Sequence, residues 1–285
     1  MDPRLFVRLD EDPLQGPESS APQGTLRAMP VCAALQPYVS HILLYRESFA
    51  KGQEVIERVV PDGAVRLILN LGDSPAAGPT LLAVGPSAAP VMVRLRGHMD
   101  GVSITLRPGA ASVLLGVPAG ELAGAAVPLQ DLWTRGAADL LGVLAGQADD
   151  ARRIDAFQLA LRLRLPHTQP PTHPLAVHAL RLLTASSGRW KVRDVAAEMG
   201  IGERRLQQLF HAHMGLPPRT WSRLARMHDC LRALRRHPDK AWADAAADAG
   251  FYDQPHLVNE FRELCGCTPA EFRRLATSGS SKTGG

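Results

Sequence analysis

An internal repeat in the last third of the sequence constrains the fold more than any other feature. Ala196 and Gly200 correspond to Ala246 and Gly250, 50 residues later. Five more pairs follow at an offset of 51: Leu206 and Leu257, Phe210 and Phe261, Gly215 and Gly266, Pro218 and Pro269, and Trp221 and Phe272. The change of offset predicts one extra residue between Gly250 and Leu257. Seven paired positions with a single shift indicate a duplicated structural unit.

Each copy of the repeat has the pattern of two short helices joined by a tight turn. In the second copy, a small-residue helix pattern over 241–249 stops at Gly250, and glycine permits the positive φ that a sharp turn can require. The next helix pattern begins after Asp253, a favourable N-cap residue, and places Leu257 and Phe261 on one face. This arrangement predicts a helix-turn-helix motif, whose second helix has the shape to enter the major groove of DNA.

A longer helix pattern over Pro218–Arg236 joins the two copies. Its roughly 19 residues would span about 28 Å at 1.5 Å per residue. That length is comparable with one turn of B-DNA, about 34 Å, so one chain could read two successive major-groove segments. The alternative is a tandem helical module that binds a protein, although helical solenoids usually need at least three repeats.

The charge of the chain is unevenly distributed. Residues 1–174 contain 15 Lys and Arg against 17 Asp and Glu, whereas residues 175–277 contain 16 against 11. The excess of positive charge therefore lies in the part that carries the repeat, as expected of a nucleic-acid-binding domain. An ordinary basic, solvated surface would give the same counts.

The cysteines and the hydropathy pattern indicate a cytoplasmic protein. Cys32, Cys230, Cys265 and Cys267 do not form a disulfide framework, which fits a reducing compartment. A zinc site at Cys265 and Cys267 would need two more ligands, and none is evident at suitable spacing. No run of about 18 apolar residues predicts a membrane span, and the acidic, proline-rich N-terminus is unlike a signal peptide.

The first part of the chain predicts an α+β domain, a small β-barrel or sandwich followed by helices. Strand patterns separated by Gly and Pro turns cover 38–45, 55–60, 65–71, 81–84, 91–95 and 102–106. Ala- and Leu-rich helix patterns cover 110–116, 120–126, 129–133, 137–146 and 149–165, the last with Ile154, Phe157, Leu161 and Leu165 on one face.

These patterns divide the chain into five segments. They are a flexible N-terminal arm (1–30), a sensor or dimerisation domain (31–165), a proline-rich linker (166–174), an all-α domain with two helix-turn-helix motifs joined by the linking helix (175–276) and a flexible tail (277–285). Helix patterns of the all-α domain cover 175–186, 192–199, 203–213, 218–236, 241–249, 254–264 and 269–275.

The sequence shows no set of catalytic residues. It lacks a G-x-S-x-G elbow, an HExxH pair and a glycine-rich phosphate loop. His98 and Asp100 lie in a predicted turn and His41 in a strand, too scattered for a metal site. We therefore expect no enzymatic activity, no cofactor and no metal; the competing reading is an enzyme that uses His98 or Asp100.

The repeat resembles the DNA-binding domain of the AraC/XylS family of bacterial transcription regulators. The residues that carry the resemblance are Ala246, Gly250-Phe251, Asp253, Leu257, Phe261-Arg262, Gly266, Thr268-Pro269 and Phe272-Arg273. The first domain more weakly resembles the N-terminal domain of a little-characterised branch of that family, through Pro61-Asp62-Gly63, Asn70-Leu71-Gly72, Gly85, Gly97 and Arg107-Pro108-Gly109.

The exposed faces of the two second helices are the candidate reading surfaces. With Leu206, Leu209 and Phe210 in the core, Arg204, Gln207, Gln208 and His211 share an outward stripe, and Arg and Gln side chains can pair with guanine and adenine. The resemblance implies base reading by Arg204, Arg205, Gln207 and Gln208, and in the second motif by Gln254, Pro255, His256 and Asn259. Four further arginines are candidates either for phosphate contacts or for salt-bridged surface positions: Arg193, Arg262, Arg273 and Arg274.

The resemblance implies a sequence-specific transcription regulator that binds double-stranded DNA at a promoter or operator. It also implies RNA polymerase, a small-molecule effector and a second copy of the chain as further partners. Arg94, Arg96 and Arg107 alternate with apolar residues on the last predicted strands, where they would either bind an anion or face solvent.

Overall fold

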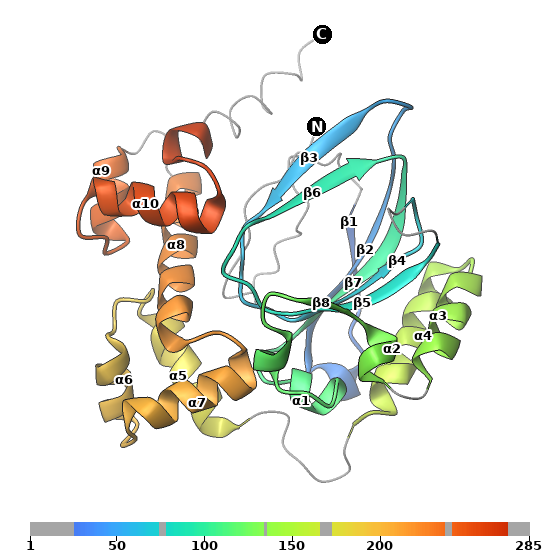
Figure 1. Ribbon diagram of the computed structural model, residues 1–285, viewed down its shortest axis with the longest axis horizontal. Helices are drawn as coiled ribbons and strands as arrows, with labels where there is room; N and C mark the ends of the chain where they lie inside the picture. The colour runs from blue at the N-terminus through green and yellow to red at the C-terminus, as the bar shows by residue number, and fades with distance from the viewer. Residues whose placement is uncertain (1–25, 74–77, 134–135, 166–172, 237–240, 273–285) are drawn as a thin grey trace.

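A computed structural model describes residues 26–73, 78–133, 136–165, 173–236 and 241–272 (Figure 1). Within these ranges the chain forms an N-terminal domain of strands and helices and a C-terminal helical domain. The predicted tail, most of the predicted linker and residues 1–25 of the predicted arm lie outside the described residues. No helix in the described part is long and apolar enough to cross a bilayer.

An antiparallel sheet forms the body of the N-terminal domain. The strands are β1 (Leu26–Met29), β2 (Val39–Ser48), β3 (Glu54–Val59), β4 (Arg66–Asn70), β5 (Thr80–Val84), β6 (Val91–Arg96), β7 (His98–Leu106) and β8 (Ala126–Pro128). Six of them pair in the order β1-β2-β7-β4-β5-β8, and β3 and β6 form a separate two-stranded sheet. The sequence predicts a small barrel or a sandwich. The structure instead has an open six-stranded sheet, with β1 and β8 at its edges, and a separate two-stranded sheet of β3 and β6.

Helices cover one face of this sheet and complete the α+β domain (Figure 1). They are the short 3₁₀ helices η1 (Ala33–Leu35) and η2 (Ala119–Leu122), and α1 (Ala111–Leu114), α2 (Leu129–Leu132), α3 (Ala137–Gly146) and α4 (Asp150–Arg162). Ile154, Phe157 and Leu161 of α4 are buried, as the helix period predicts, and they share one apolar core with Leu67 and Ile104 of the sheet.

Three local predictions for this domain are wrong, each because a non-local contact overrides local pattern. Residues 26–29 belong to β1 instead of the arm, since they pair with β2 as a mostly exposed edge strand. The end of the helix predicted over 120–126 belongs to β8, which pairs with β5. His98 and Asp100 lie in β7 instead of a turn, because they pair with Ser48 and Arg46 of β2.

The C-terminal domain is all-α, as predicted. Its helices are α5 (Pro174–Ala185), α6 (Val192–Glu198), α7 (Glu203–Met214), α8 (Pro218–Arg236), α9 (Trp242–Asp248) and α10 (Gln254–Cys265). Each agrees with its predicted range to within one residue at either end. The helix α8 runs between the two helix pairs (Figure 1), and Leu224 and Leu231 on α8 join Phe210 and Phe261 in one core.

A turn of the N-terminal domain is buried in this C-terminal core. Val60, just after β3, belongs to the same apolar cluster as Trp221 of α8. The next residue, Pro61, accepts a hydrogen bond of 2.8 Å through its carbonyl oxygen from Nε2 of the fully buried His228. A Cβ atom on Gly63 would lie 2.8 Å from the Trp221 ring, so this position tolerates only glycine without movement. The two domains are therefore packed together through buried contacts.

A second contact joins the N-terminal domain to the end of α7. A Cβ atom on Gly120 of η2 would lie 2.6 Å from the His211 ring, and one on Gly215 would lie 2.3 Å from Pro86. Figure 1 shows α7 directed at this part of the N-terminal domain. The helix predicted to read DNA thus meets the N-terminal domain at its C-terminal end.

Asp62 holds the buried turn in shape. Its carboxylate accepts hydrogen bonds from the Ala64 amide at 2.9 Å and from the Arg66 guanidinium at 3.0 Å. Burial acts to raise the pKa of Asp62, but the charge and hydrogen bonds of Arg66 and the Ala64 amide outweigh it, so that the net pKa lies below its usual value.

We expect Asp62→Asn to lower the free energy of unfolding by about 1–3 kcal/mol at pH 7, because Arg66 loses a charged partner while the Ala64 amide keeps its acceptor. A carboxylate with a lowered folded-state pKa stabilises the fold above its unfolded pKa of about 3.9 and loses this effect as the pH falls through the folded value. The difference between the two proteins should therefore narrow below about pH 4.

Urea unfolding at a series of pH values measures this difference. Asp155→Asn, on an exposed position of α4, is the matched control and should leave stability unchanged. A deficit of Asp62→Asn that stayed constant down to pH 2 would contradict the assigned ion pair.

Candidate nucleic-acid interface

The turns of the two helix-turn-helix motifs contain equivalent backbone hydrogen bonds. In the first motif the Ile201 amide donates to the Ala196 carbonyl at 3.0 Å, and in the second the Phe251 amide donates to the Ala246 carbonyl at 2.9 Å. Gly200 and Gly250 have φ angles of 65° and 75°, in the left-handed region that glycine adopts without strain. The predicted role of these glycines is confirmed.

The second turn contains one residue more than the first, as the change of offset predicts. Residues 199–202 separate α6 from α7, and residues 249–253 separate α9 from α10. The longer turn ends in Asp253, whose side chain accepts a hydrogen bond of 2.7 Å from the His256 amide, whereas Gly202 gives α7 no side-chain cap. The two motifs share a frame but begin their second helices differently.

Both second helices present a polar face opposite a buried one. Leu206, Leu209 and Phe210 of α7 are buried, and so are Leu257 and Phe261 of α10. Four candidate reading residues of α7 are all exposed, and their side chains form no hydrogen bond or ion pair with other described residues: Arg204, Arg205, Gln207 and Gln208. His211 completes the stripe, but η2 packs against it.

The candidate residues of α10 divide into two groups. Gln254, Pro255 and Asn259 are exposed. His256 is engaged within its own motif: its Nδ1 accepts a hydrogen bond of 3.2 Å from the Tyr252 amide, and its ring stands edge-on to Phe251 at 5.5 Å. This geometry assigns His256 to the support of the turn.

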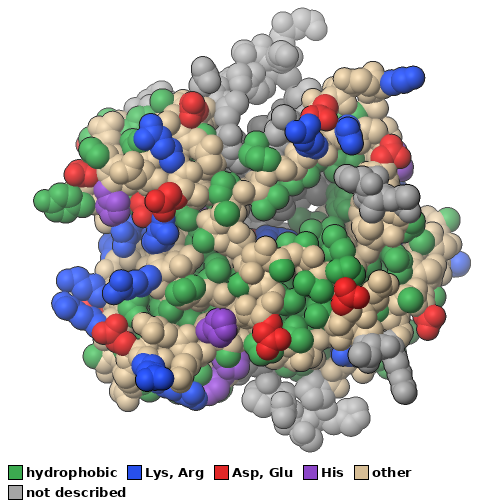
Figure 2. Space-filling model, in the orientation of Figure 1, with side chains coloured by type: hydrophobic (Ala, Val, Ile, Leu, Met, Phe, Trp, Pro, Cys, Tyr) green, Lys and Arg blue, Asp and Glu red, His purple; other side chains and the backbone are tan. Residues whose placement is uncertain are grey.

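The candidate phosphate partners are only partly described. Arg193 and Arg262 are exposed, and Arg193 lies 3.4 Å from Asp194. Arg273 and Arg274 lie outside the described residues. Figure 2 shows Lys and Arg side chains gathered at the left of the view, over the C-terminal domain.

Sequence reasoning missed a row of arginines on α8. Arg219, Arg223 and Arg226 follow one another at intervals of four and three residues, which place them on one helix face, and they line a groove of about 590 Å³ together with Arg193. Arg223 lies 2.8 Å from Glu260 of α10, so it joins the linking helix to the second motif. The spacing of these arginines in the sequence could have indicated a shared helix face, but not the contact of Arg223 with Glu260.

Arg226 joins the linking helix to both motifs. Its guanidinium donates to the Gly188 carbonyl at 2.9 Å, just before the first motif, and lies 5.6 Å from the Phe251 ring in the second turn. Tyr252, next to Phe251, is 92% exposed, another residue of this surface that pattern reasoning did not select. Arg226 therefore fixes the second turn, and the segment just before the first motif, to α8.

The other residues considered in the sequence analysis are packed in the core or contact neighbouring side chains. Cys265 and Cys267 are buried in the core of the C-terminal domain. Asp100 lies 3.0 Å from Arg46, and His98 contacts Ser48 at 3.1 Å. Arg94 pairs with Glu54 at 3.2 Å. Within the described residues no three His, Cys, Asp or Glu side chains cluster as metal ligands would.

Family comparisons agree with the geometry of the C-terminal domain. Residues 195–275 match a family model described as a helix-turn-helix domain, and residues 27–128 match a domain of unknown function, DUF6597. The transcriptional regulator ExsA of Pseudomonas aeruginosa is 32% identical over 88 residues, which are 30% of each chain. The virulence regulon activator VirF of Yersinia enterocolitica is 32% identical over 95 residues, 32% of this chain and 34% of that protein.

Among solved structures, ToxT of Vibrio cholerae matches with 13% identity and a TM-score of 0.41, over 82% of this chain and 97% of that one. The sequence matches span about a third of the length of the curated relatives.

The C-terminal domain is thus a helix-turn-helix domain with two motifs on one linking helix. Residues 195–275 are more narrowly a domain of the AraC type, which confirms the resemblance to the AraC/XylS family noted in the sequence.

We expect Asp253→Ala to weaken the second motif specifically. Loss of an N-cap acceptor costs about 1 kcal/mol of stability. Hydrogen exchange should accelerate at the His256 amide and along the first turn of α10, with little change in α7. Asp253→Asn keeps an acceptor and is the matched control; equal acceleration in both variants would argue against the cap.

Proposed function

We propose that this protein is a sequence-specific DNA-binding transcription regulator that reads two successive major-groove segments with α7 and α10. The observation that carries the proposal is the repetition of one helix-turn-helix frame on a single linking helix, with a polar, exposed face on each second helix. A helix of this kind places its exposed side chains against base edges.

The side chains on α7 suit direct reading of bases. Arginine can bind guanine through two hydrogen bonds, and glutamine can bind adenine in the same way. Arg204, Gln207 and Gln208 are exposed and spaced for one helix face, and no described side chain competes for their donors. We assign most of the sequence discrimination to this helix.

The second motif offers fewer base-reading groups. Pro255 has no donor and can give only apolar contact, Asn259 is short, and His256 is occupied by the turn. We propose that α10 mainly positions the chain, with Gln254 and Asn259 as its base contacts and Arg262 as a phosphate contact.

Several finer assignments extend this function. The N-terminal domain would act as an effector-sensing or dimerising domain, and RNA polymerase would be a further partner at the promoter. Because promoter DNA and RNA polymerase lie in the bacterial cytoplasm, we propose that this protein acts there. The regulators named above match this chain over about a third of their length, and they support the regulatory part of the proposal.

Arg204→Ala and Gln207→Ala should each weaken binding to the specific site by about 1–3 kcal/mol and leave binding to random DNA nearly unchanged. Fluorescence anisotropy with the site found by genome-wide mapping of bound DNA measures both affinities. Arg152→Ala, on an exposed position of α4, is the control and should bind like the unchanged protein.

A protein that bound no promoter fragment above random DNA, at any salt concentration, would refute the proposal. Salt-insensitive binding to a protein partner would instead favour a helical protein-interaction module.

Arg193→Ala and Arg262→Ala should weaken binding to all DNA sequences alike. Each lost phosphate contact reduces the slope of log K against log salt concentration by about 1. Titrations between 50 and 200 mM salt (roughly the range in which such slopes are measured) test this, and an unchanged slope would remove these residues from the phosphate contacts.

A further inference from the structure

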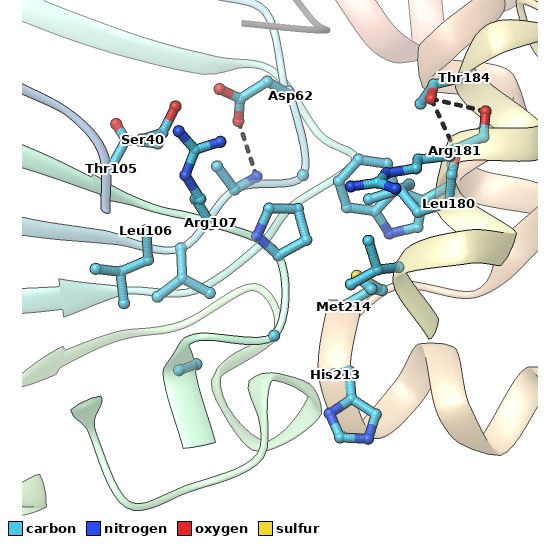
Figure 3. A pocket seen from close by; sticks show the side chains of 18 of the residues that line it. Ser40, Asp62, Thr105, Leu106, Arg107, Leu180, Arg181, Thr184, His213 and Met214 are labelled. Carbon is cyan, nitrogen blue, oxygen red and sulfur yellow. Dashed lines mark hydrogen bonds between the residues drawn. The ribbon is translucent and has the colours of Figure 1, made fainter. Parts of the chain in front are cut away.

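Two histidines from separate helices of the C-terminal domain face each other. His173 is the N-cap residue of α5, and His213 lies in the last turn of α7. Their ring centres are 5.4 Å apart, and the ring planes make an angle of 45°. Figure 3 shows the His213 ring on the helical side of a cavity of about 580 Å³, away from Asp62 and Thr105 of the N-terminal domain. The pair thus brings the start of α5 against the end of α7.

The hydrogen bonds of the surrounding structure do not use these two rings. The side chain of His173 makes no capping hydrogen bond to α5, and its Nδ1 is buried with no hydrogen-bond partner among the described residues. A buried polar atom without a partner is destabilising. A neutral imidazole keeps a lone pair on one of its two nitrogens, and this lone pair is what a metal ion binds.

The arrangement of the two rings fits a shared metal ion better than an aromatic contact. Aromatic pairs favour nearly parallel, offset rings or perpendicular rings, and an angle of 45° is neither. In a tetrahedral zinc site the Zn–N distance is about 2.0–2.1 Å and the ring centre lies about 1.1 Å behind the nitrogen, so two histidine rings have centres roughly 5.2 Å apart. The observed separation of 5.4 Å is close to this value.

The electrostatic surroundings keep His213 in the form that binds metals. Burial and, after it, the charges of His173 and Arg205 lower the pKa of His213 below its usual value of about 6.5. The ring is therefore neutral at pH 7, as a metal ligand must be. The charge of Arg205 also opposes a cation, so we expect a moderate affinity.

We propose that His173 and His213 bind one divalent transition-metal ion, for which Zn²⁺ is the reference. Among the described residues no third His, Cys, Asp or Glu side chain joins the pair, so water would complete the coordination. Imidazole ligands suit zinc, nickel and copper, whereas Mg²⁺ prefers oxygen ligands. The site does not depend on the proposed function. An ion bound there would hold α5 against α7 and stabilise the folded domain.

Calorimetric titration of the untagged full chain with Zn²⁺, and separately with Mg²⁺, tests the site. We expect saturable binding of one zinc ion to the pair and no saturable binding of Mg²⁺, because the ligands are nitrogens. Absence of saturable zinc binding up to about 1 mM, or equal binding of Mg²⁺, would overturn the proposal.

Three variants locate the ion. His173→Gln and His213→Gln each remove one ligand and should weaken zinc binding at least about tenfold, since even the loss of an outer-shell partner costs a metal site roughly 10–100-fold. His178→Gln, at an exposed position of α5, is the matched control and should bind zinc like the unchanged chain. Equal weakening in the control would assign the ion to other histidines. If His213→Gln fails to fold, His173→Gln decides, and an unchanged affinity there would refute the site.

Thermal unfolding gives a second measurement, because an ion that binds only the folded chain raises its Tm. Zinc at about a hundredfold above its Kd should raise the Tm of the unchanged chain by about 5–10 °C, and a chelator should reverse the rise. The variant with both substitutions, His173→Gln and His213→Gln, should show no rise. An equal rise in this variant, or no rise in the unchanged chain, would contradict the proposed site.

Discussion

The structure depends on one constraint, the attachment of the second helix-turn-helix turn, and of the segment just before the first motif, to one helix, α8. Gly200 and Gly250 close the turns of the two motifs in the same way, because both adopt positive φ and each is followed by the same amide-to-carbonyl hydrogen bond. Arg223 and Arg226 then tie α8 to the second motif and to the start of the first. The relative position of the two reading helices is therefore set by α8 and not by a flexible connection.

The two helix-turn-helix motifs differ in the contacts that stabilise the start of their second helices, α7 and α10. The first motif relies on its apolar core and has no side-chain cap at Gly202, whereas the second uses the cap of Asp253 and a hydrogen bond to Nδ1 of the half-buried His256. A side chain that supports a turn has fewer hydrogen-bonding groups left for DNA. The support of the second turn and the base reading proposed for its helix thus involve one shared residue, His256.

The features that the sequence could predict are those determined by neighbours along the chain. The period of Leu206, Leu209 and Phe210, the N-cap at Asp253 and the glycine turns are local, so the C-terminal helices and their exposed faces were predictable. The strand at residues 26–29 and the edge strand β8 depend on pairing with distant strands, which a single sequence does not display. The same holds for the engagement of His256 and the partners of Arg223, because both depend on packing across the motif.

The contact between the N-terminal domain and the end of α7 gives the two motifs different surroundings. The first motif touches the N-terminal domain through His211 and Gly215, whereas α9 and α10 pack chiefly on α8 and on each other. A conformational change in the N-terminal domain would therefore act on the first motif more directly than on the second. The two ends of the duplicated domain therefore differ in their surroundings: the first motif contacts the N-terminal domain, and the second packs chiefly on α8.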